Sequence, residues 1–358
     1  MEETQLRDPG FWLSDLPWAP GAEMPVVEGE VPGLIFFRTS GSTGEPKWIG
    51  LHREALLCSA AAVNRHLGVT ASDVWGALLP LHHVGGFGVL ARAFEAGSEF
   101  RRFHGKWDPR AASAWMEKEQ VHHCPMVPTQ IHDLVAAKLR APRALRTVVV
   151  GGGSLPDALG RAARNLGWPV LASYGMTEAG SQIATQKIDQ LETDYQAFPI
   201  PVMAHWRVMP TPDGRLEISG PALFSGMIRR VEGCLKYEPR KGSSFLTSDR
   251  VLVEERGISV LGRADRQVKV LGELVDLDDL ERILGPDVLV VGLPDARKGQ
   301  ELVLLAIDEN VAQRVESHNA RVAGPWRIQR WMKVARLPRT PLGKLDRREA
   351  RRMIENLS

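Results

Sequence analysis

Short apolar runs alternate with segments of helical spacing through the first half of the chain. The helical segments place apolar residues three and four positions apart, and the short runs have the length of buried strands. This alternation is typical of an α/β fold with substantial parallel pairing. The predicted strands are residues 34–37, 75–79, 121–127, 147–150 and 170–173, and the predicted helices are residues 52–67, 129–139 and a further helix that Ser154 caps.

The pattern of apolar and turn-forming residues changes after Tyr195 and again near Asp265. Short strands divided by Gly, Pro and Asp turns first predict a β-rich subdomain of the distorted-barrel kind. Short strands and short helices then predict a compact α+β domain. We therefore expect a large N-terminal α/β domain, residues 1–263, and a small mobile C-terminal domain, residues 264–358. The later predicted strands are residues 215–219, 251–254, 258–261, 288–292 and 302–307.

Composition excludes several classes of protein. The formal charge of +2 gives no reason to expect nucleic acid or an anionic membrane as a partner. Three widely spaced cysteines argue against a disulfide framework and favour the reducing cytoplasm. No apolar run is long enough for a signal peptide or a membrane span. The run of basic residues near the C-terminus, Arg347, Arg348, Arg351 and Arg352, is predicted to be a solvated helix face.

A loop rich in Ser, Thr and Gly directly follows the first predicted strand. It consists of Thr39, Ser40, Gly41, Ser42, Thr43, Gly44, Glu45, Pro46 and Lys47. Glycines let backbone N–H groups point inward, and hydroxyls and a lysine donate to phosphate oxygens. The order of residues is not that of a Walker A loop. Composition alone leaves an ordinary flexible turn as the alternative.

Three further segments carry candidate chemistry. In the segment 173–178, Tyr174 can stack on a purine, Thr177 can bond a phosphate and Glu178 can hold Mg²⁺, although the same residues could merely cap a turn. Asp249 and Arg263 offer a carboxylate and a guanidinium to ribose hydroxyls, or form a surface ion pair.

Lys344 lies in a Pro- and Gly-rich segment near the C-terminus. Such a lysine is ordinarily solvent-facing.

Together and in this order, these segments resemble the acyl-adenylate-forming (AMP-binding) superfamily from about Leu34 to Met353. The loop reads like the family's T-S-G-[ST]-T-G-x-P-K signature, and residues 174–178 read like its Y-G-x-T-E. The resemblance implies an AMP-forming acid–thiol ligase that uses ATP, Mg²⁺ and coenzyme A. It also implies a C-terminal domain that rotates about a hinge at Asp265 after adenylation.

The resemblance further implies roles for single residues. Thr39 to Lys47 would hold the ATP phosphates, Tyr174 the adenine, Thr177 the α-phosphate, Glu178 the metal, and Asp249 and Arg263 the ribose. Lys344 would neutralise charge as the carboxylate attacks the α-phosphorus. The acyl pocket would contain His83, Gly151, Gly152, Gly153, Thr129 and Ser181. Adjacent pairs such as His82 and His83 could instead suggest a metal site, but no Cys or carboxylate completes a ligand set.

Within the superfamily, the chain is most similar to the o-succinylbenzoate–CoA ligases of menaquinone synthesis. The cues are Tyr174–Ile183, Met126–Gln130 and the small overall size. An acid with two carboxylates needs a second anion-binding group, for which Thr129, Gln130, His123 and Ser181 are candidates. Alternatives are another acyl- or aryl-CoA synthetase, a ligase with an amine or carrier-protein acceptor, or a nucleotide-binding regulator; homodimer formation is left open.

The chain also departs from the superfamily pattern. Only about 33 residues precede the first strand, so part of the usual N-terminal subdomain is expected to be reduced. Residues 271–274, Leu-Gly-Glu-Leu, replace a more usual Gly-Gly-Glu-Asn, which leaves contacts to coenzyme A the least defined.

Overall fold

The structure, a computed structural model, describes residues 3–39, 47–295, 297–308, 310–322, 324–340 and 345–356. The chain forms two compact units. Unit 1 comprises Met1–Met209, Glu217–Leu246 and Val253–Ser259, and unit 2 comprises Pro210–Leu216, Thr247–Leu252 and Val260–Ser358. The predicted domain limit between residues 263 and 264 stays a prediction, because compactness alone does not define a domain.

A six-stranded sheet is the centre of unit 1, with the order β4-β3-β5-β6-β7-β8. Its strands are parallel except β8, which pairs antiparallel with β7. Buried apolar runs such as Thr147–Val150 are typical of strands covered on both faces. The strands are β3 (Val74–Ala77), β4 (Glu99–Arg102), β5 (His123–Met126), β6 (Thr147–Val150), β7 (Val170–Met176) and β8 (Ser181–Thr185).

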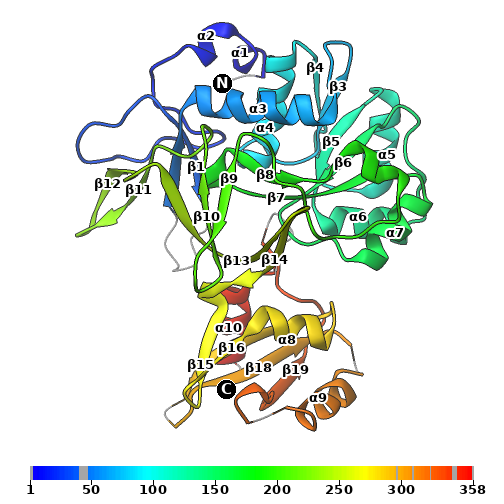
Figure 1. Ribbon diagram of the computed structural model, residues 1–358, viewed down its shortest axis with the longest axis vertical. Helices are drawn as coiled ribbons and strands as arrows, with labels where there is room; N and C mark the ends of the chain where they lie inside the picture. The colour runs from blue at the N-terminus through cyan, green and yellow to red at the C-terminus, as the bar shows by residue number, and fades with distance from the viewer. Residues whose placement is uncertain are drawn as a thin grey trace. The chain divides into compact units, whose positions relative to one another are not determined.

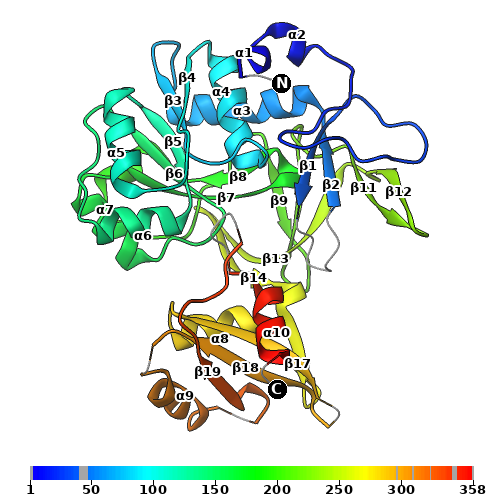
Figure 2. The same cartoon turned by 180° about the vertical axis from the view of Figure 1, so that it is seen from behind.

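Two groups of helices accompany this sheet (Figures 1 and 2). Helix α3 (Arg53–Leu67) packs on α4 (Val84–Ala96). The second group consists of α5 (Pro109–Lys118), α6 (Pro128–Ala136) and α7 (Asp157–Asn165). The α/β fold class predicted from the alternation is confirmed, and the predicted helix at residues 52–67 differs from α3 by one residue.

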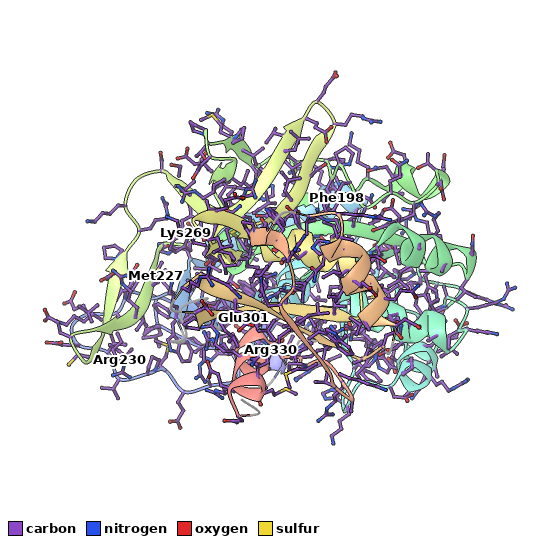
Figure 3. The ribbon with its side chains drawn as sticks, turned by 90° about the horizontal axis from the view of Figure 1, so that it is seen from below. Phe198, Met227, Arg230, Lys269, Glu301 and Arg330 are labelled. Atoms are coloured by element: carbon purple, nitrogen blue, oxygen red, sulfur yellow. The ribbon has the colours of Figure 1, made fainter. Side chains whose placement is uncertain are left out.

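A second sheet, β1-β2-β11-β12, is antiparallel throughout. It contains β1 (Ile35–Thr39), β2 (Lys47–Leu51), β11 (Gly226–Val231) and β12 (Cys234–Pro239). Met227 lies opposite Ile49 of β2, and Arg230 lies toward the β11–β12 turn (Figure 3). The first predicted strand therefore belongs to an antiparallel sheet and not to the parallel one.

A third sheet has the order β14-β13-β10-β9. It contains β9 (Arg207–Pro210), β10 (Arg215–Ser219), β13 (Ser244–Glu254) and β14 (Gly257–Arg263). Among the strands that the structure describes, this sheet and the second one are open, so the β-rich region is not a closed barrel. Strand β10 has the predicted limits.

Short elements precede these sheets. Helices α1 (Glu3–Leu6) and α2 (Pro9–Trp12) lie in the N-terminal arm, the residues that precede strand β1. The buried Arg53 guanidinium donates to the carbonyl oxygens of Phe11, Leu16 and Gly33 at 2.8 to 2.9 Å. These bonds fix the arm to helix α3.

Unit 2 has an αβ core built on both faces of the sheet β17-β18-β19. Successive strand residues point to opposite faces, so Val288 and Val290 pack with α8 and α9, whereas Leu289 and Val291 pack with α10. Figures 1 and 2 show α8 and α10 on opposite sides of this sheet. The elements are β15 (Gln267–Val270), β16 (Glu273–Asp276), α8 (Leu277–Leu284), β17 (Val288–Asp295), β18 (Gly299–Ala306), α9 (Val311–Asn319), β19 (Arg330–Lys333) and α10 (Arg347–Glu355).

Two expectations from the sequence are wrong in detail. Ser154 does not cap α7, because the helix begins at Asp157 and Pro156 occupies the N-cap position without a side-chain bond. The basic run in α10 is not uniformly solvated, because the Arg347 side chain is only 19% exposed and paired with Glu281. No helix in the described part of the chain has both the length and the apolar character needed to cross a membrane.

The β15–β16 turn contains a residue in an unfavourable backbone conformation. Leu271 has a φ of 51° and Gly272 a φ of 89°. The left-handed region costs an ordinary residue about 1 kcal/mol or more, and asparagine tolerates it better. We predict that Leu271→Asn raises the free energy of unfolding of unit 2 by about 1 kcal/mol, measured by amide hydrogen exchange of strands β15 and β16.

Leu274→Asn is the matched control, because Leu274 is also exposed but lies in strand β16 rather than in the turn. The control should give no gain in stability. An equal gain from both substitutions would show that lost exposed apolar surface, and not turn geometry, is responsible.

Candidate active site

The ends of the predicted phosphate loop meet across the β1–β2 hairpin. Thr39 pairs with Lys47 in the antiparallel register, and the Thr39 hydroxyl donates to the Lys47 carbonyl at 3.4 Å. The predicted loop residues Ser40, Gly41, Ser42, Thr43 and Gly44 lie outside the described residues. Strand pairing therefore brings together the first and last residues of the loop.

The segment Tyr174–Glu178 lies at the end of β7, where the chain turns into β8. The strand register shifts between Tyr174 and Gly175, and a short 3-10 helix, η1 (Thr177–Ala179), makes the turn. A Cβ on Gly175 would lie 1.6 Å from the Ser181 carbonyl oxygen, so only glycine allows the two backbones to approach. The glycine thus fixes where the neighbouring Tyr174, Thr177 and Glu178 project.

Buried hydrogen bonds hold β7 and β8 together beside this turn. The Gln182 side-chain amide donates to the hydroxyls of Ser173 and Thr185 at 3.1 and 3.0 Å, and these hydroxyls are 2.9 Å apart. The Glu178 carbonyl accepts from the Phe224 N–H at 2.8 Å. The side chains of Tyr174, Thr177 and Glu178 are half-buried. The backbone that carries them is therefore held by hydrogen bonds to β8 on one side and to Phe224 on the other.

His83 occupies the N-cap position of helix α4. Its carbonyl accepts from the N–H groups of Gly86 and Phe87 at 3.0 and 2.9 Å. A Cβ on Gly86 would lie 2.3 Å from the Pro80 carbonyl oxygen, so the helix begins tight against the preceding loop. This contact sets the position of the half-buried His83 ring, which lies 4.3 Å from the His82 ring.

The glycine turn after β6 lies against the start of helix α6. Gly151 donates its N–H to the Met126 carbonyl at 3.1 Å, and Gly152 has a φ of 77°. A Cβ on Gly153 would be in ordinary contact, 3.6 Å, with the Pro128 ring. The structure therefore brings the predicted pocket residues Gly151–Gly153 and Thr129 into one region.

Of the candidates for a second anion-binding group, His123 is engaged elsewhere and Gln130 is engaged through its side-chain oxygen. The His123 Nδ1 atom is 2.7 Å from the Thr147 hydroxyl, and its Nε2 atom is 3.6 Å from an Asp73 carboxylate oxygen. Burial lowers the pKa of His123 to about 4, so the ring is neutral near pH 7. The Gln130 side chain accepts from the Val127 N–H at 3.0 Å. A neutral ring that faces a carboxylate does not attract an anion.

The sequence reading missed Arg92, which is a better candidate. Its side chain projects from helix α4, is only 2% exposed, and lies with its guanidinium carbon 5.2 Å from the Trp75 ring centre. Nη2 donates to the Ser181 hydroxyl at 3.4 Å, whereas Nη1 has no partner among the described residues. Burial lowers the pKa to about 10, which leaves the group charged near pH 7.

Ser181 itself has a φ of 120°, a region that few residues other than glycine adopt. Backbone strain of this kind is concentrated at functional sites. A sequence signal for Arg92 did exist, because it is the only basic residue in the largely apolar helix Val84–Ala96, whose one other charged residue is Glu95. A buried arginine on such a helix needs either a carboxylate partner in the protein or an anionic ligand.

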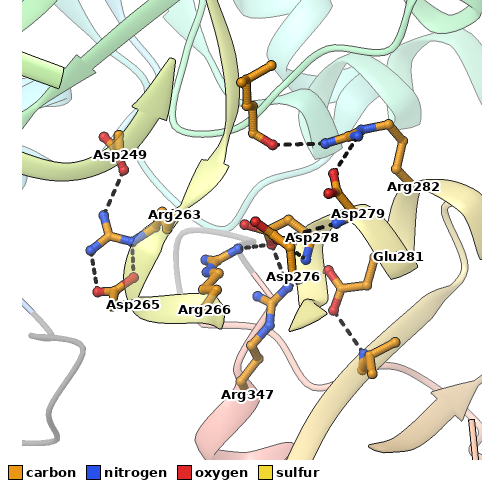
Figure 4. Close-up of polar contacts among 12 residues, drawn as sticks. Asp249, Arg263, Asp265, Arg266, Asp276, Asp278, Asp279, Glu281, Arg282 and Arg347 are labelled. Carbon is orange, nitrogen blue, oxygen red and sulfur yellow. Dashed lines mark hydrogen bonds and ion pairs between the residues drawn. The ribbon is translucent and has the colours of Figure 1, made fainter. Parts of the chain in front are cut away.

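Unit 2 contains the other predicted residues. Arg263 donates to Asp249 at 3.0 Å and to both carboxylate oxygens of Asp265 at 2.8 and 2.7 Å (Figure 4). Asp249 is buried at the middle of β13, where the Thr247 hydroxyl accepts from its N–H. The structure thus brings together the two predicted ribose ligands and the predicted hinge residue. Lys344 lies outside the described residues.

The close approach at Gly175 leads to a prediction. Gly175→Ala should lower the free energy of unfolding by about 3 kcal/mol, because the added carbon would overlap the β8 backbone and force the strands apart. Denaturant unfolding of the full chain measures this difference.

Gly151→Ala is the control. Its added carbon would be in ordinary contact, 3.6 Å from the Ser173 carbonyl oxygen, and its φ lies outside the left-handed region. The control should change stability by less than about 1 kcal/mol. Equal losses from both variants would contradict a specific requirement at Gly175.

Comparison with known proteins adds to this geometry. The chain is 30% identical over 349 residues to a 2-succinylbenzoate–CoA ligase of Geobacillus kaustophilus, and the match covers 91% of this chain and 70% of that protein. Its fold resembles that of the o-succinylbenzoate CoA synthetase MenE from Bacillus subtilis in complex with OSB-AMP. The TM-score is 0.75 and the identity 23%, over 88% of this chain and 68% of that one.

Another structure of MenE from Bacillus subtilis, in complex with ATP and magnesium ion, gives a TM-score of 0.74 at 22% identity. That match covers 98% of this chain and 81% of the other. Residues 16–227 match the sequence pattern of the AMP-binding enzymes, which is more than half of the chain. These residues include β1 and β2 at the ends of the predicted loop and the Tyr174–Glu178 turn. The chain belongs to the AMP-binding enzyme family.

Proposed function

We propose that this chain is an AMP-forming acid–CoA ligase whose acid is 2-succinylbenzoate, also called o-succinylbenzoate. A carboxylate oxygen of the acid attacks the α-phosphorus of ATP and pyrophosphate leaves. The thiol sulfur of coenzyme A then attacks the acyl carbon and AMP leaves. Family membership supports the reaction class, and the buried, incompletely paired Arg92 is the observation that carries the choice of acid.

The first step brings two anions together, so it needs donors and cations around the phosphates. We assign this task to the loop Thr39–Lys47, to Thr177 and to Lys344. The Glu178 carboxylate offers oxygen ligands suited to Mg²⁺, which would neutralise phosphate charge when bound. Tyr174 would cover the adenine, and Asp249 with Arg263 would bond the ribose.

The acid has an aromatic ring and two carboxylates, of which one is activated. The second carboxylate would leave water and therefore needs a charged donor. Arg92 meets this need, because its Nη1 atom lacks a partner among the described residues and its Nη2 atom is bonded only weakly to Ser181. His83, Thr129 and Gly151–Gly153 would line the rest of the acid pocket.

The second step requires coenzyme A to reach the acyl-adenylate. In the family this follows a rotation about the residue that Asp265 matches, and we propose the same hinge here. The three cysteines are unbridged, which is consistent with a cytoplasmic enzyme.

A pyrophosphate-release assay tests the proposal. ATP, Mg²⁺ and 2-succinylbenzoate should give pyrophosphate and AMP, and coenzyme A should convert the adenylate into a thioester detectable by mass spectrometry. Benzoate and an aliphatic monocarboxylate are the comparison acids. Release of pyrophosphate with the comparison acids but not with 2-succinylbenzoate would reject the proposed substrate, and release with no acid of a broad panel would reject the enzyme class.

Lys344→Ala should lower the rate of adenylation by about 100-fold or more, because the transition state would lose a positive charge. Thioester formation from supplied acyl-adenylate should change little, since in that step the thiol attacks the acyl carbon and not phosphorus. Lys118→Ala, at the exposed end of helix α5, is the control and should leave both rates unchanged. An equal loss in both steps would contradict the role of Lys344.

Arg92→Gln should lower kcat/KM for 2-succinylbenzoate by roughly 10- to 100-fold, the usual value of a charged hydrogen bond. The kcat/KM for an aromatic acid with one carboxylate should fall much less, because that acid leaves the guanidinium unused. Steady-state kinetics with the two acids measure the ratio. If both values fell equally, Arg92 would have a structural role only.

A further inference from the structure

Three elements of unit 1 border the Arg92 guanidinium. Arg92 belongs to α4, which packs on strand β3, and the ring centre of Trp75 in β3 lies 5.2 Å from the guanidinium carbon. Ser181 of β8 accepts from Nη2 at 3.4 Å. Gly88 lies one helical turn before Arg92 on the same face of α4 and carries no side chain. A ring, a hydroxyl and a bare helix turn therefore define the place of one cation.

The glycine at position 88 leaves room for the guanidinium. A Cβ on Gly88 would lie 3.2 Å from Arg92 Nη2 and 3.9 Å from the Ser181 Cβ. The first distance is tighter than ordinary van der Waals contact, so an alanine would displace the guanidinium by a few tenths of an ångström. Gly88 lies inside a regular helix, where alanine is preferred to glycine, so its backbone conformation does not account for the glycine.

Trp75 is itself held by the neighbouring strands. It lies opposite His123 of β5 in the parallel register, and the two ring centres are 5.2 Å apart. The His123 ring is in turn bonded to the Thr147 hydroxyl of β6. Both rings are fully buried. His123 thus supports the ring that stands beside Arg92.

The contact between Trp75 and Arg92 uses the face of the ring. The guanidinium carbon stands over this face, which attracts a cation most strongly where water is excluded, and Arg92 is almost completely buried. Burial is the one cause that shifts the pKa of Arg92, so no carboxylate in the described part of the chain compensates its charge. The Trp75 N–H has no hydrogen-bond partner among the described residues. The ring face is therefore the part of Trp75 that serves Arg92.

We propose that Trp75 is a positioning residue for the Arg92 guanidinium, and that the pair selects acids with a second carboxylate. The ring covers the cation and Ser181 engages Nη2. Nη1, which lacks a partner among the described residues, is left for the carboxylate. This inference rests on the proposed function, and it assigns to Trp75 no contact with ATP or with the acid.

A double-mutant cycle in the full chain tests whether Trp75 acts through Arg92. The measured quantity is kcat/KM for 2-succinylbenzoate, from steady-state pyrophosphate release. Trp75→Leu should lower it by about 5- to 30-fold, mainly by raising KM. In the Arg92→Gln background the same substitution should lower it by less than about 3-fold, because the ring then has no cation to hold.

Two further tryptophan variants separate this role from core packing. Trp75→Phe keeps a ring face and should restore most of the lost kcat/KM. Trp168→Leu is the matched control, because Trp168 is also buried in unit 1 but its N–H donates to the Leu139 carbonyl at 2.8 Å. The control should lower the thermal midpoint of unfolding without raising KM for the acid.

Gly88→Ala disturbs the guanidinium without opening a cavity. Alanine favours the helix, so the fold should be at least as stable as the wild type, whereas Arg92 Nη2 must move. The variant should raise KM for 2-succinylbenzoate by about 3-fold or more. Gly85→Ala in the same helix is the control and should match the wild type, because its added carbon would be in ordinary contact, 3.6 Å from Leu79 Cδ1.

Equal losses from Trp75→Leu in the two backgrounds would overturn the positioning role. A loss from Trp75→Phe as large as that from Trp75→Leu would also overturn it, as would an unchanged KM in Gly88→Ala. The proposed function fails separately, if the wild-type chain releases no pyrophosphate with 2-succinylbenzoate.

Discussion

The backbone contact between Gly175 and Ser181 is the constraint on which the rest of the unit 1 site depends. The strands β7 and β8 approach so closely there that no side chain fits at residue 175. On one side of this contact the chain turns through Thr177 and Glu178, the candidates for phosphate and metal. On the other side Ser181 is held at a φ of 120° beside the Arg92 guanidinium. One contact therefore fixes both the nucleotide candidates and the acid candidate.

Features that depend on neighbouring residues could be predicted from the sequence. Strand β6 has the predicted limits, and helix α3 differs by one residue, because apolar periodicity is a local property. The family could be predicted because its motifs are contiguous segments. Antiparallel pairing of β1 with β2 could not be predicted, since an isolated apolar run does not reveal its partner strand.

Charged residues with distant partners were beyond the reach of local patterns. The local pattern predicts that Arg347 belongs to a solvated face, yet its partner Glu281 lies 66 residues earlier. No local pattern singles out the partner of Arg92, because the hydroxyl that it contacts lies 89 residues later. Arginine and glutamate are exposed in most contexts, so the few buried ones become visible only when the fold supplies their surroundings. Among the described residues the buried arginines are Arg53 and Arg92, and the proposal for the acid rests on Arg92.

The ion pairs on either side of the peptide bond between Asp265 and Arg266 have a mechanical consequence. The Asp265 carboxylate is held by Arg263, whereas the Arg266 guanidinium is held by Asp278 of helix α8. Two adjacent residues are thus anchored to different partners. A rotation that keeps both ion pairs intact is confined to the two soft dihedrals that flank this peptide, ψ of Asp265 and φ of Arg266. The segment therefore combines two anchored side chains with two rotatable backbone bonds between them.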